Sequence, residues 1–184
     1  SRDKSIQLIN DANNGNKILG VSAQKDKGIE HPSPSDIYSI GTAAQILRVL
    51  KMPDGNTTVI IQGKKRFKIK SFTEEKPYLR AEVEAIEDKS SSSKNSEFDA
   101  TIDSIKDMAL QIIQDNPNIP SEASFAIKNI QSPSFLINFV SSNMNLSVGD
   151  KQKILAVIDI HKQAILSLKY MNIEYQKLVL KNDI

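Results

Sequence analysis

The serine-rich segment DKSSSSKNSE, residues 88–97, sets the main constraint on how this chain folds. Serine and lysine side chains cannot build a hydrophobic core, so the segment indicates a linker or an exposed loop. The residues before it alternate between apolar and polar as β-strands do, whereas the residues after it repeat apolar side chains at helical spacing. We therefore predict an α+β protein with a β-rich subdomain over residues 1–88, a linker over 89–97 and an all-helical subdomain over 98–184.

The strongest local signal in the first half is the turn Pro53-Asp54-Gly55, which lies between ILRVLKM and TTVII. Proline presets the first turn position, and glycine takes the left-handed backbone conformation that such a turn requires. The flanking runs are rich in β-branched and long apolar residues, so the pattern predicts a β-hairpin. Gly63 predicts the end of its second strand, and a third strand follows over RFKIKSF. A short surface helix that stops at Gly15 precedes these strands.

The last two predicted strands, RFKIKSF and LRAEVEAIE, carry opposite charges on their solvent faces. Arg66, Lys68 and Lys70 share one face of the first strand, and Glu82 and Glu84 share one face of the second. Two interpretations follow: cross-strand ion pairs, each worth ~0.2 to 1 kcal/mol, or a stripe of cations that follows a nucleic-acid backbone. The first is favoured, because binding of single-stranded nucleic acid needs aromatic residues interleaved with the cations and only one is available.

The second half predicts helices over EFDATIDSIKDMALQIIQ, PSEASFAIKNIQ and SPSFLINFVSSNM, the last of these opened by Ser132 and Pro133. A final segment has no glycine or proline after residue 149, so it predicts one long helix from about residue 148 to near the end. The distal half of this helix has few partners within the predicted bundle. We predict that its apolar residues contact a neighbouring domain or subunit, through Met171, Tyr175 and Leu178.

Composition excludes several classes of protein. The formal net charge is only +2, so there is no overall electrostatic attraction to nucleic acid or to membranes. There is no cysteine, which excludes disulfide bonds and thiolate chemistry. No apolar run approaches the ~20 residues that span a bilayer. We expect a cytoplasmic chain without a membrane partner, and nucleic acid is disfavoured as a partner.

Residues suited to catalysis or metal binding are sparse. His31 and His161 are the two histidines, and neither has a second ligand at metal-site spacing. The sequence contains no G-x-S-x-G nucleophile motif and no G-x-x-x-x-G-K-[ST] phosphate loop. Glu82 and Glu84 lie on one strand face, which is typical of a solvated surface and not of an acid/base pair. We expect no catalytic residue, no metal and no cofactor in this chain.

Residues 41–88 contain an ordered set of motifs that resembles the N-terminal domain of Lon, the ATP-dependent serine protease. The motifs are a Gly-Thr pair, a Pro-Asp-Gly hairpin, a strand with Gly-x-x-Arg-Phe, a Pro-Tyr pair and an Ala-x-Val strand. They fall at Gly41-Thr42, Pro53-Asp54-Gly55, Gly63 with Arg66-Phe67, Pro77-Tyr78, and Ala81 with Val83. The similarity extends in both directions and covers essentially the whole chain.

The resemblance implies a β-rich pseudo-barrel related to PUA domains, followed by a helical subdomain whose long helix leads toward an ATPase module. It also implies a noncatalytic role in recognising unfolded or damaged protein substrates and in supporting a homohexamer. The implied parent is an ATP-dependent serine endopeptidase, whose AAA+ module, ATP, Mg²⁺ and Ser-Lys dyad lie outside this chain. Two alternatives stay open: a stand-alone protein-binding adaptor with this fold and, less favoured, a PUA-like RNA-binding module.

Members of that family normally begin with a strand of the LPLR...FP type, whereas this chain begins at the helix that follows it. The resemblance therefore implies a fragment of a longer chain. If that strand is missing, one edge of the predicted sheet is unpaired and can recruit another strand.

Residues next to irregular segments are the candidates for contact with a protein substrate, because they can be exposed without disrupting a sheet. Cations at a helix N-terminus oppose the helix dipole, so Arg2 and Lys4, which flank Asp3, are predicted to serve a contact. Apolar residues beside the proline-rich loop and at the start of the last strand complete the predicted substrate-binding set: Ile37, Tyr38, Ile40, Tyr78 and Leu79.

Overall fold

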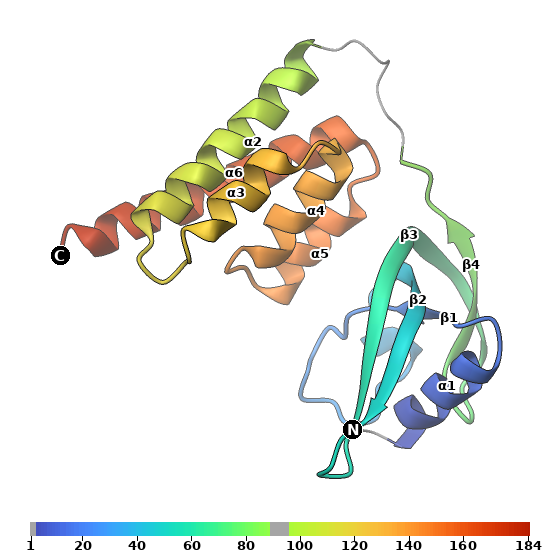
Figure 1. Ribbon diagram of the computed structural model, residues 1–184. Helices are drawn as coiled ribbons and strands as arrows, with labels where there is room; N and C mark the ends of the chain where they lie inside the picture. Colours follow the sequence, from blue (N-terminus) through green and yellow to red (C-terminus); the bar gives the residue numbers. More distant parts are fainter. Residues whose placement is uncertain (1–2, 89–95) are drawn as a thin grey trace. The chain divides into compact units, whose positions relative to one another are not determined.

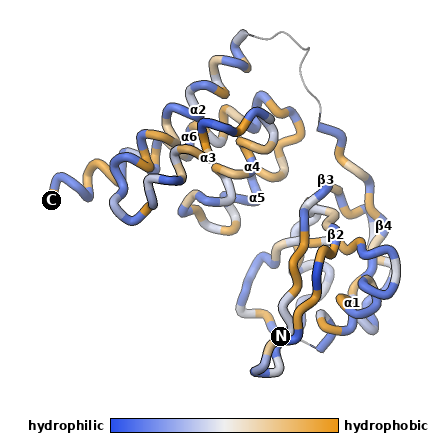
Figure 2. The backbone as a smooth tube through the Cα atoms, in the orientation of Figure 1, coloured by the Kyte–Doolittle hydropathy of each residue, from blue (hydrophilic) through white to orange (hydrophobic). Residues whose placement is uncertain are grey.

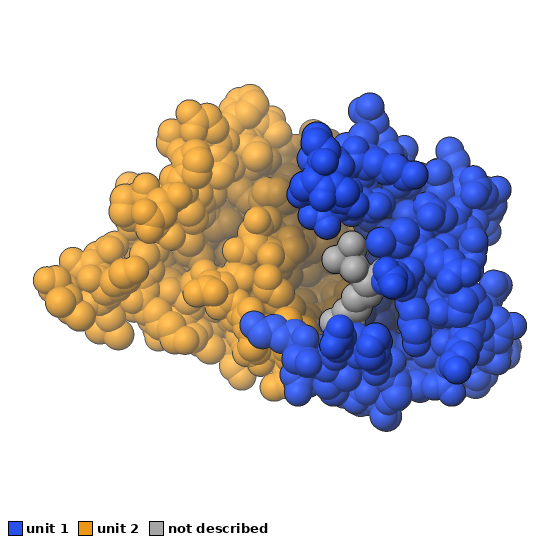
Figure 3. Space-filling view, turned by 90° about the horizontal axis from the view of Figure 1, so that it is seen from below, with its two compact units in different colours: residues 1–87 blue, residues 88–184 orange. Residues whose placement is uncertain are grey.

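The computed structural model describes residues 3–88 and 96–184. The chain divides into two units, Ser1–Glu87 and Asp88–Ile184 (Figures 1 and 3). Residues 89–95 of the predicted linker lie outside the described residues, and α2 begins at Ser96. Hydrophobic residues occur throughout both units (Figure 2), so each unit has apolar side chains for a core of its own.

The first unit combines a helix with a four-stranded antiparallel sheet in the order β1-β2-β3-β4. α1 ends directly before Gly15, as the sequence predicts. The elements are α1 (Asp3–Asn14), β1 (Ile18–Val21), the 3₁₀ turn η1 (Pro34–Asp36), β2 (Ile40–Lys51), β3 (Thr57–Glu74) and β4 (Arg80–Ala85).

The predicted β-hairpin is confirmed, since β2 and β3 pair on either side of the Pro53-Asp54-Gly55 turn. Gly55 has a φ of 88°, in the left-handed region that favours glycine. The Met52 N–H donates to the carbonyl of Asn56 at 2.8 Å and closes the turn. The Asn56 N–H in turn donates to Asp54 Oδ1 at 2.9 Å. This hydrogen bond is the main reason that the pKa of Asp54 lies below its ordinary value.

The prediction that Gly63 ends a strand is wrong. β3 runs without a break from Thr57 to Glu74, and Gly63 lies beside a register shift between Ala43 and Ala44 of β2. A glycine inside a strand often marks a bulge, where an extra residue bends the strand. One long strand thereby pairs with β2 along most of its length and with β4 at its far end.

The basic face of β3 lies beside acidic residues of β4. Lys68 is directly opposite Glu84 in the strand pairing, while Lys70 falls at a register shift. An ion pair between Lys65 and Glu87 joins β3 to the residues after β4. These groups are exposed, so each pair contributes at most ~1 kcal/mol. The arrangement supports the cross-strand interpretation of the charged faces.

The core of the first unit is small. Its buried apolar side chains, all 8% exposed or less in the described part of the unit, are Ala44, Ile46, Phe67 and Ile86. Gly41 is packed against this core, because a Cβ there would lie 2.8 Å from Phe67 Cζ and 2.2 Å from Ser22 Oγ. Many other apolar residues of the unit stay partly exposed, among them Ile18, Ile60 and Val83.

The second unit is a bundle of five helices within the described residues. α2 and α6 pack along each other (Figure 1), and Ser132 caps α4 by accepting the Phe135 N–H at 3.3 Å, as predicted. The elements are α2 (Ser96–Asp115), α3 (Glu122–Asn129), α4 (Pro133–Asn143), α5 (Val148–Ala156) and α6 (Ile160–Asn182). Together with the antiparallel sheet, this bundle confirms the predicted α+β class.

The prediction of one helix from about residue 148 to the end is wrong, although α6 is itself long. α5 ends at Ala156, and α6 begins at Ile160. Asp159 is the N-cap of α6, since its carboxylate accepts the Lys162 N–H at 2.9 Å. The break lets α5 pack back against α6 and bury Ile154, which is 2% exposed.

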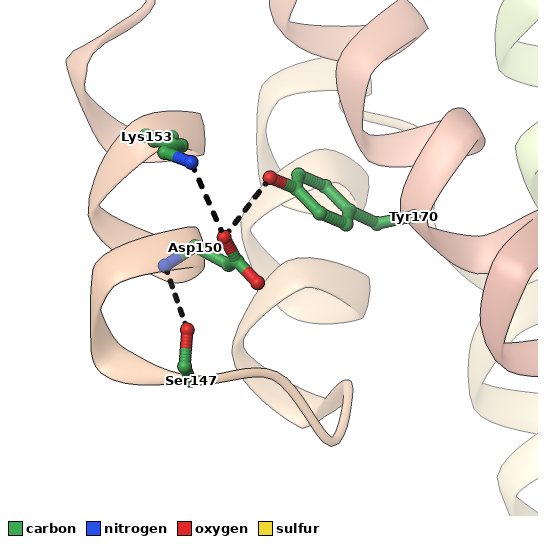
Figure 4. Close-up of polar contacts among 4 residues, drawn as sticks. All are labelled: Ser147, Asp150, Lys153 and Tyr170. Carbon is green, nitrogen blue, oxygen red and sulfur yellow. Dashed lines mark hydrogen bonds and ion pairs between the residues drawn. The ribbon is translucent and has the colours of Figure 1, made fainter.

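Polar contacts fix α5 against α6. The hydroxyl of Tyr170 donates to Asp150 Oδ1 at 3.2 Å, and Lys153 Nζ lies 3.6 Å from the same oxygen (Figure 4). Ser147 caps α5 by accepting the Asp150 N–H at 3.1 Å. Because Asp150 lies near the start of α5 and Tyr170 ten residues into α6, the two helices run in opposite directions.

Candidate functional site

An open groove with a volume of about 1230 Å³ lies in the first unit. It is lined by α1, by β1, by the proline-rich loop and by the paired strands β3 and β4. Small-molecule sites commonly measure ~300 to 1,000 Å³. The size of the groove therefore suits a segment of polymer better than a metabolite.

The lining of the groove is rich in apolar side chains from segments that are distant in sequence. Ile18 of β1 is 44% exposed and Val83 of β4 is 46% exposed, so both retain accessible apolar surface. Phe67 lies at the floor and belongs to the core. The leucine, isoleucine, valine and phenylalanine residues of the lining are Leu8, Ile18, Leu19, Ile37, Phe67, Ile69, Phe72, Leu79 and Val83. Exposed apolar surface in a concave site is typical of a binding surface for apolar groups.

The charges around the groove nearly cancel. The lining includes four carboxylates, of Asp3, Asp11, Glu30 and Glu75, and three permanent cations, of Lys4, Lys76 and Arg80. The groove therefore attracts neither strongly acidic nor strongly basic ligands over a distance.

One hydrogen bond links α1 to the segment between β3 and β4 across the groove. The hydroxyl of Tyr78 donates to Asp11 Oδ2 at 2.9 Å. This bond raises the pKa of Tyr78, because the protonated phenol is the form that donates to the carboxylate. The contact joins the two sides of the groove.

Five of the predicted substrate-binding residues line this groove: Asp3, Lys4, Ile37, Tyr78 and Leu79. Tyr38 and Ile40 do not line it, although they are close in sequence to Ile37. The Tyr38 N–H donates to the Ala23 carbonyl at 3.0 Å, and Ile40 is the first residue of β2. Arg2 lies outside the described residues.

Sequence reasoning missed the lining residues of α1 and β1, above all Leu8 and Ile18. Leu8 belongs to the apolar side of α1, and the apolar side of that helix is the sequence feature that could have located it. Ile18 is a β-branched residue in a short strand, and nothing local indicates that this strand ends up at a sheet edge. Their proximity to Leu79 depends on long-range packing.

The predicted intermolecular contacts on the long helix are not supported for Met171, which is 2% exposed within the bundle core. Tyr175 also has a partner in its own chain, since its hydroxyl donates to Asp115 Oδ2 at 2.9 Å. Leu178 is half-buried. The physical reason is that α2 runs beside α6 as far as Asp115, its last residue. The carboxylate of Asp115 accepts a hydrogen bond from Tyr175, and its backbone carbonyl accepts one from the side-chain amide of Asn182.

A different set of apolar residues is exposed on α6. Ile165, Ile173 and Leu180 are 50%, 42% and 66% exposed. At 3.6 residues per turn these three positions fall within about 80° of one another around the helix axis. They form an apolar stripe, which we call the α6 stripe, on the side of the helix that the bundle does not cover.

Across residues 3–88 and 96–184, no three His, Cys, Asp or Glu side chains gather as the ligands of a metal ion would. In the same residues, no helix combines the length and the hydropathy needed to cross a bilayer.

Comparison with solved structures places the fold in a known class. The crystal structure of a Lon N-terminal domain protein from Xanthomonas campestris superposes with a TM-score of 0.64 at 16% identity, covering 93% of this chain and 86% of that one. The N-terminal domain of Mycobacterium avium complex Lon protease gives a TM-score of 0.62 at 18% identity, covering 84% and 90% of the two chains. The shared feature at this identity is the fold.

Sequence comparison identifies the family. The model of the ATP-dependent protease La (LON) substrate-binding domain matches residues 1–172. The chain is 59% identical over 183 residues to the Lon protease of Flavobacterium johnsoniae and 42% identical over 183 residues to that of Cytophaga hutchinsonii. This protein belongs to the LON substrate-binding domain family. The match covers 100% of this chain but 22% of each of these relatives, so the chain spans about a fifth of their length.

Proposed function

We propose that this chain is the noncatalytic substrate-recognition region of an ATP-dependent serine protease, and that it captures unfolded or damaged protein segments in the groove of the first unit. The observation that carries the proposal is the groove itself, which is larger than a small-molecule site, apolar inside and nearly neutral at its rim. An unfolded chain differs from a folded one mainly in its exposed apolar side chains, and such a groove can cover them. The parent protein supplies the ATPase and protease modules, with ATP and Mg²⁺, in the cytoplasm.

A titration tests the capture of unfolded segments. Leu79→Ser removes apolar surface from the groove, whereas Leu47→Ser removes an exposed leucine of β2 that does not line it. Loss of most of one leucine contact costs roughly 1 to 2 kcal/mol, or about five- to thirtyfold in affinity. We expect this loss with a fluorescently labelled, permanently unfolded protein for Leu79→Ser and little change for Leu47→Ser. Equal affinities for both variants would contradict binding in the groove.

The isolated chain should bind such a substrate weakly. One small apolar surface must offset the entropy lost on association, whereas several copies in a ring act together through their effective concentration. A parent hexamer should therefore bind the same unfolded protein much more tightly per site. The same affinity per site in the chain and in the parent would remove the multivalent part of the proposal.

Support of hexamer assembly is proposed for the α6 stripe. Ile173→Ser and Leu180→Ser change exposed residues, so the double variant should keep the stability of the isolated bundle but weaken the parent assembly in sedimentation. Lys181→Ser, an exposed change on the same helix outside the stripe, is the matched control. If the double variant leaves the assembly of the parent unchanged, the α6 stripe does not support the hexamer.

Two alternatives predict other results. A stand-alone adaptor would bind substrate with full affinity without any ATPase or protease module. An RNA-binding module would bind single-stranded RNA through Arg66, Lys68 and Lys70, with affinity falling steeply between low and moderate salt.

A further inference from the structure

We propose that a hollow between α2 and α3 binds a small organic acid, which has an apolar body of several carbons and a single carboxylate. The hollow has a volume of about 630 Å³. Small-molecule sites commonly measure ~300 to 1,000 Å³, so a ligand of this kind can fill it. The hollow belongs to the second unit and the groove to the first, so this inference is independent of the proposed function.

Two helix faces and the turn that joins them form the hollow. α2 contributes Leu110 and the residues three and four positions after it, and α3 contributes its N-cap Ser121 and the residues three and seven positions after that. Residues at these spacings lie on one face of a helix. The lining residues, all from the internal stretch 110–128, are Leu110, Ile113, Gln114, Asn116, Pro117, Ile119, Ser121, Ser124 and Lys128. α2 and α3 follow one another along the chain and pack together (Figure 1).

Part of the lining is apolar. Leu110 and Ile113 pack against the core of the bundle but stay half-buried, so some of their surface remains accessible beside the hollow. Ile119 of the turn is half-buried as well. A ligand that covers these side chains with methylene groups gains about three- to fourfold in affinity for each methylene that is fully buried.

The polar part of the lining has hydrogen-bond donors to offer. Ser121 is the N-cap of α3, but its hydroxyl makes no capping hydrogen bond. Among residues 3–88 and 96–184, the side chains of Gln114, Ser124 and Lys128 also have no hydrogen-bond or ion-pair partner. All four side chains carry donors, and a carboxylate accepts up to about four hydrogen bonds.

The charge of the lining selects an anion. Lys128 is the one charged side chain among the described residues that line the hollow. Asp115 and Glu122 are the carboxylates closest in sequence, and neither belongs to the lining. The Asp115 carboxylate already accepts hydrogen bonds from Gln111 and Tyr175. A cationic ligand would be repelled by Lys128, and an inorganic anion would leave the apolar side chains uncovered, so the lining fits an apolar carboxylate best.

Binding of octanoate, followed through the NMR signals of the ligand, tests the role of Lys128. Lys128→Gln removes the charge of an exposed side chain, and Lys169→Gln removes an exposed charge of α6 outside the lining. An exposed ion pair changes affinity by up to about fivefold. We expect octanoate to bind Lys128→Gln about two- to fivefold more weakly than Lys169→Gln or the unaltered chain, and octanol to bind all three equally. Equal octanoate affinity in all three would overturn the proposal.

The length of the ligand tests the apolar part of the site. Butyrate has the same carboxylate as octanoate but four fewer methylene groups. We expect butyrate to bind roughly tenfold more weakly or worse, even if the methylene groups are only partly buried. Equal affinities for butyrate and octanoate would show that the apolar side chains are not covered, and this result would overturn the proposal.

Backbone amide shifts of the isotopically labelled chain identify where octanoate binds, because the groove of the first unit is apolar too. We expect shifts in residues 110–128 of the unaltered chain, and the same shifts in Leu79→Ser, whose change lies in the groove. Shifts confined to the first unit would overturn the proposal. Failure to bind an unfolded protein would refute the proposed function instead, and it would leave the octanoate shifts in place.

The last residue of a polypeptide can present the same chemistry, so competition distinguishes the two sources of the carboxylate. The tripeptide Gly-Gly-Leu has a free carboxylate, and its C-terminal amide has none. Displacement of octanoate by neither peptide supports a free acid as the ligand. Displacement by the free peptide alone supports the same site and adds polypeptide C-termini as a source. Equal displacement by the amide would overturn the proposal, because the carboxylate would then not be recognised.

The octanoate titration repeated with the full-length parent decides whether the hollow is open there. A loss of two- to fivefold for Lys128→Gln in the parent, as in the chain, supports the proposal. A parent that does not bind octanoate has the hollow covered by its other residues, and this result overturns the proposal.

Discussion

Gly41→Ala should strongly destabilise the first unit, because the added Cβ has no room. It would lie 2.2 Å from Ser22 Oγ, 2.5 Å from the carbonyl oxygen of Val21 and 2.8 Å from Phe67 Cζ. The serine hydroxyl can rotate away, but the Val21 oxygen is part of β1 and the phenyl ring is part of the core. Relief requires a shift of β1 or of Phe67, and overpacking of this kind costs ~1 to 3 kcal/mol.

We expect the upper end of this range, since two of the three contacts involve atoms that cannot move alone. A loss of about 3 kcal/mol in a unit of this size corresponds to a melting temperature lower by roughly 12 to 24 °C. Hydrogen exchange of β2 and β3 amides measures the free energy of unfolding of this unit separately from the helical bundle.

Gly63→Ala is the matched control for this measurement. Its Cβ meets only the Thr42 Cγ2 methyl, at 3.3 Å, so the change should stay within about 1 kcal/mol. Equal exchange protection in Gly41→Ala and Gly63→Ala would refute the close approach of β1 to Phe67. The floor of the groove would then have to be described differently.

Three further predictions concern the helical unit. Tyr175→Phe should lower the midpoint of denaturant unfolding of this unit, because the hydrogen bond from the Tyr175 hydroxyl to Asp115 is lost. Hydrogen bonds from Gln111 and, to a smaller extent, Tyr175 hold the pKa of Asp115 below its ordinary value of 3.8. The stability that the ionised Asp115 contributes is therefore present above pH 3.8 and is lost as the pH falls through the lower pKa of the folded state. In an acid titration of unfolding, Tyr175→Phe should lose less stability than the unaltered chain. Asp159→Ala should cost ~0.5 to 2 kcal/mol in denaturant unfolding, because the N-cap of α6 is removed, and no change would contradict the cap. Ser167→Ala should cost ~1 to 3 kcal/mol, because its buried Oγ lies 3.0 Å from Ser141 Oγ; an unchanged denaturation midpoint would show that Ser141 finds another partner.

Local signals predicted the parts of the fold that depend on neighbours in sequence. The Pro53-Asp54-Gly55 turn and the Ser132 cap each act within a few residues, and both are found as predicted. Gly63 was misread because a strand glycine has two local meanings, an end and a bulge. Only the pairing of Ala43 and Ala44 with the residues around Gly63 distinguishes them, and pairing partners are not visible in one strand's sequence.

The long-range features were the ones that sequence reasoning missed. No glycine or proline marks the break between α5 and α6, so Asp159 was the only local sign of it. The burial of Met171 depends on α2 lying beside α6, which the periodicity of α6 cannot reveal. The groove likewise brings Leu8, Ile18 and Leu79 together from three separate segments, so sequence located Leu79 without showing what lies opposite it.

Hydrogen exchange of the full-length parent, with and without a bound unfolded protein, tests the central claim most directly. The account predicts slower exchange on binding in β1 and in residues 76–83, which line the groove, with no change around Leu47 of β2. Protection confined to the helical unit, or none in the first unit at saturating substrate, would contradict capture in the groove.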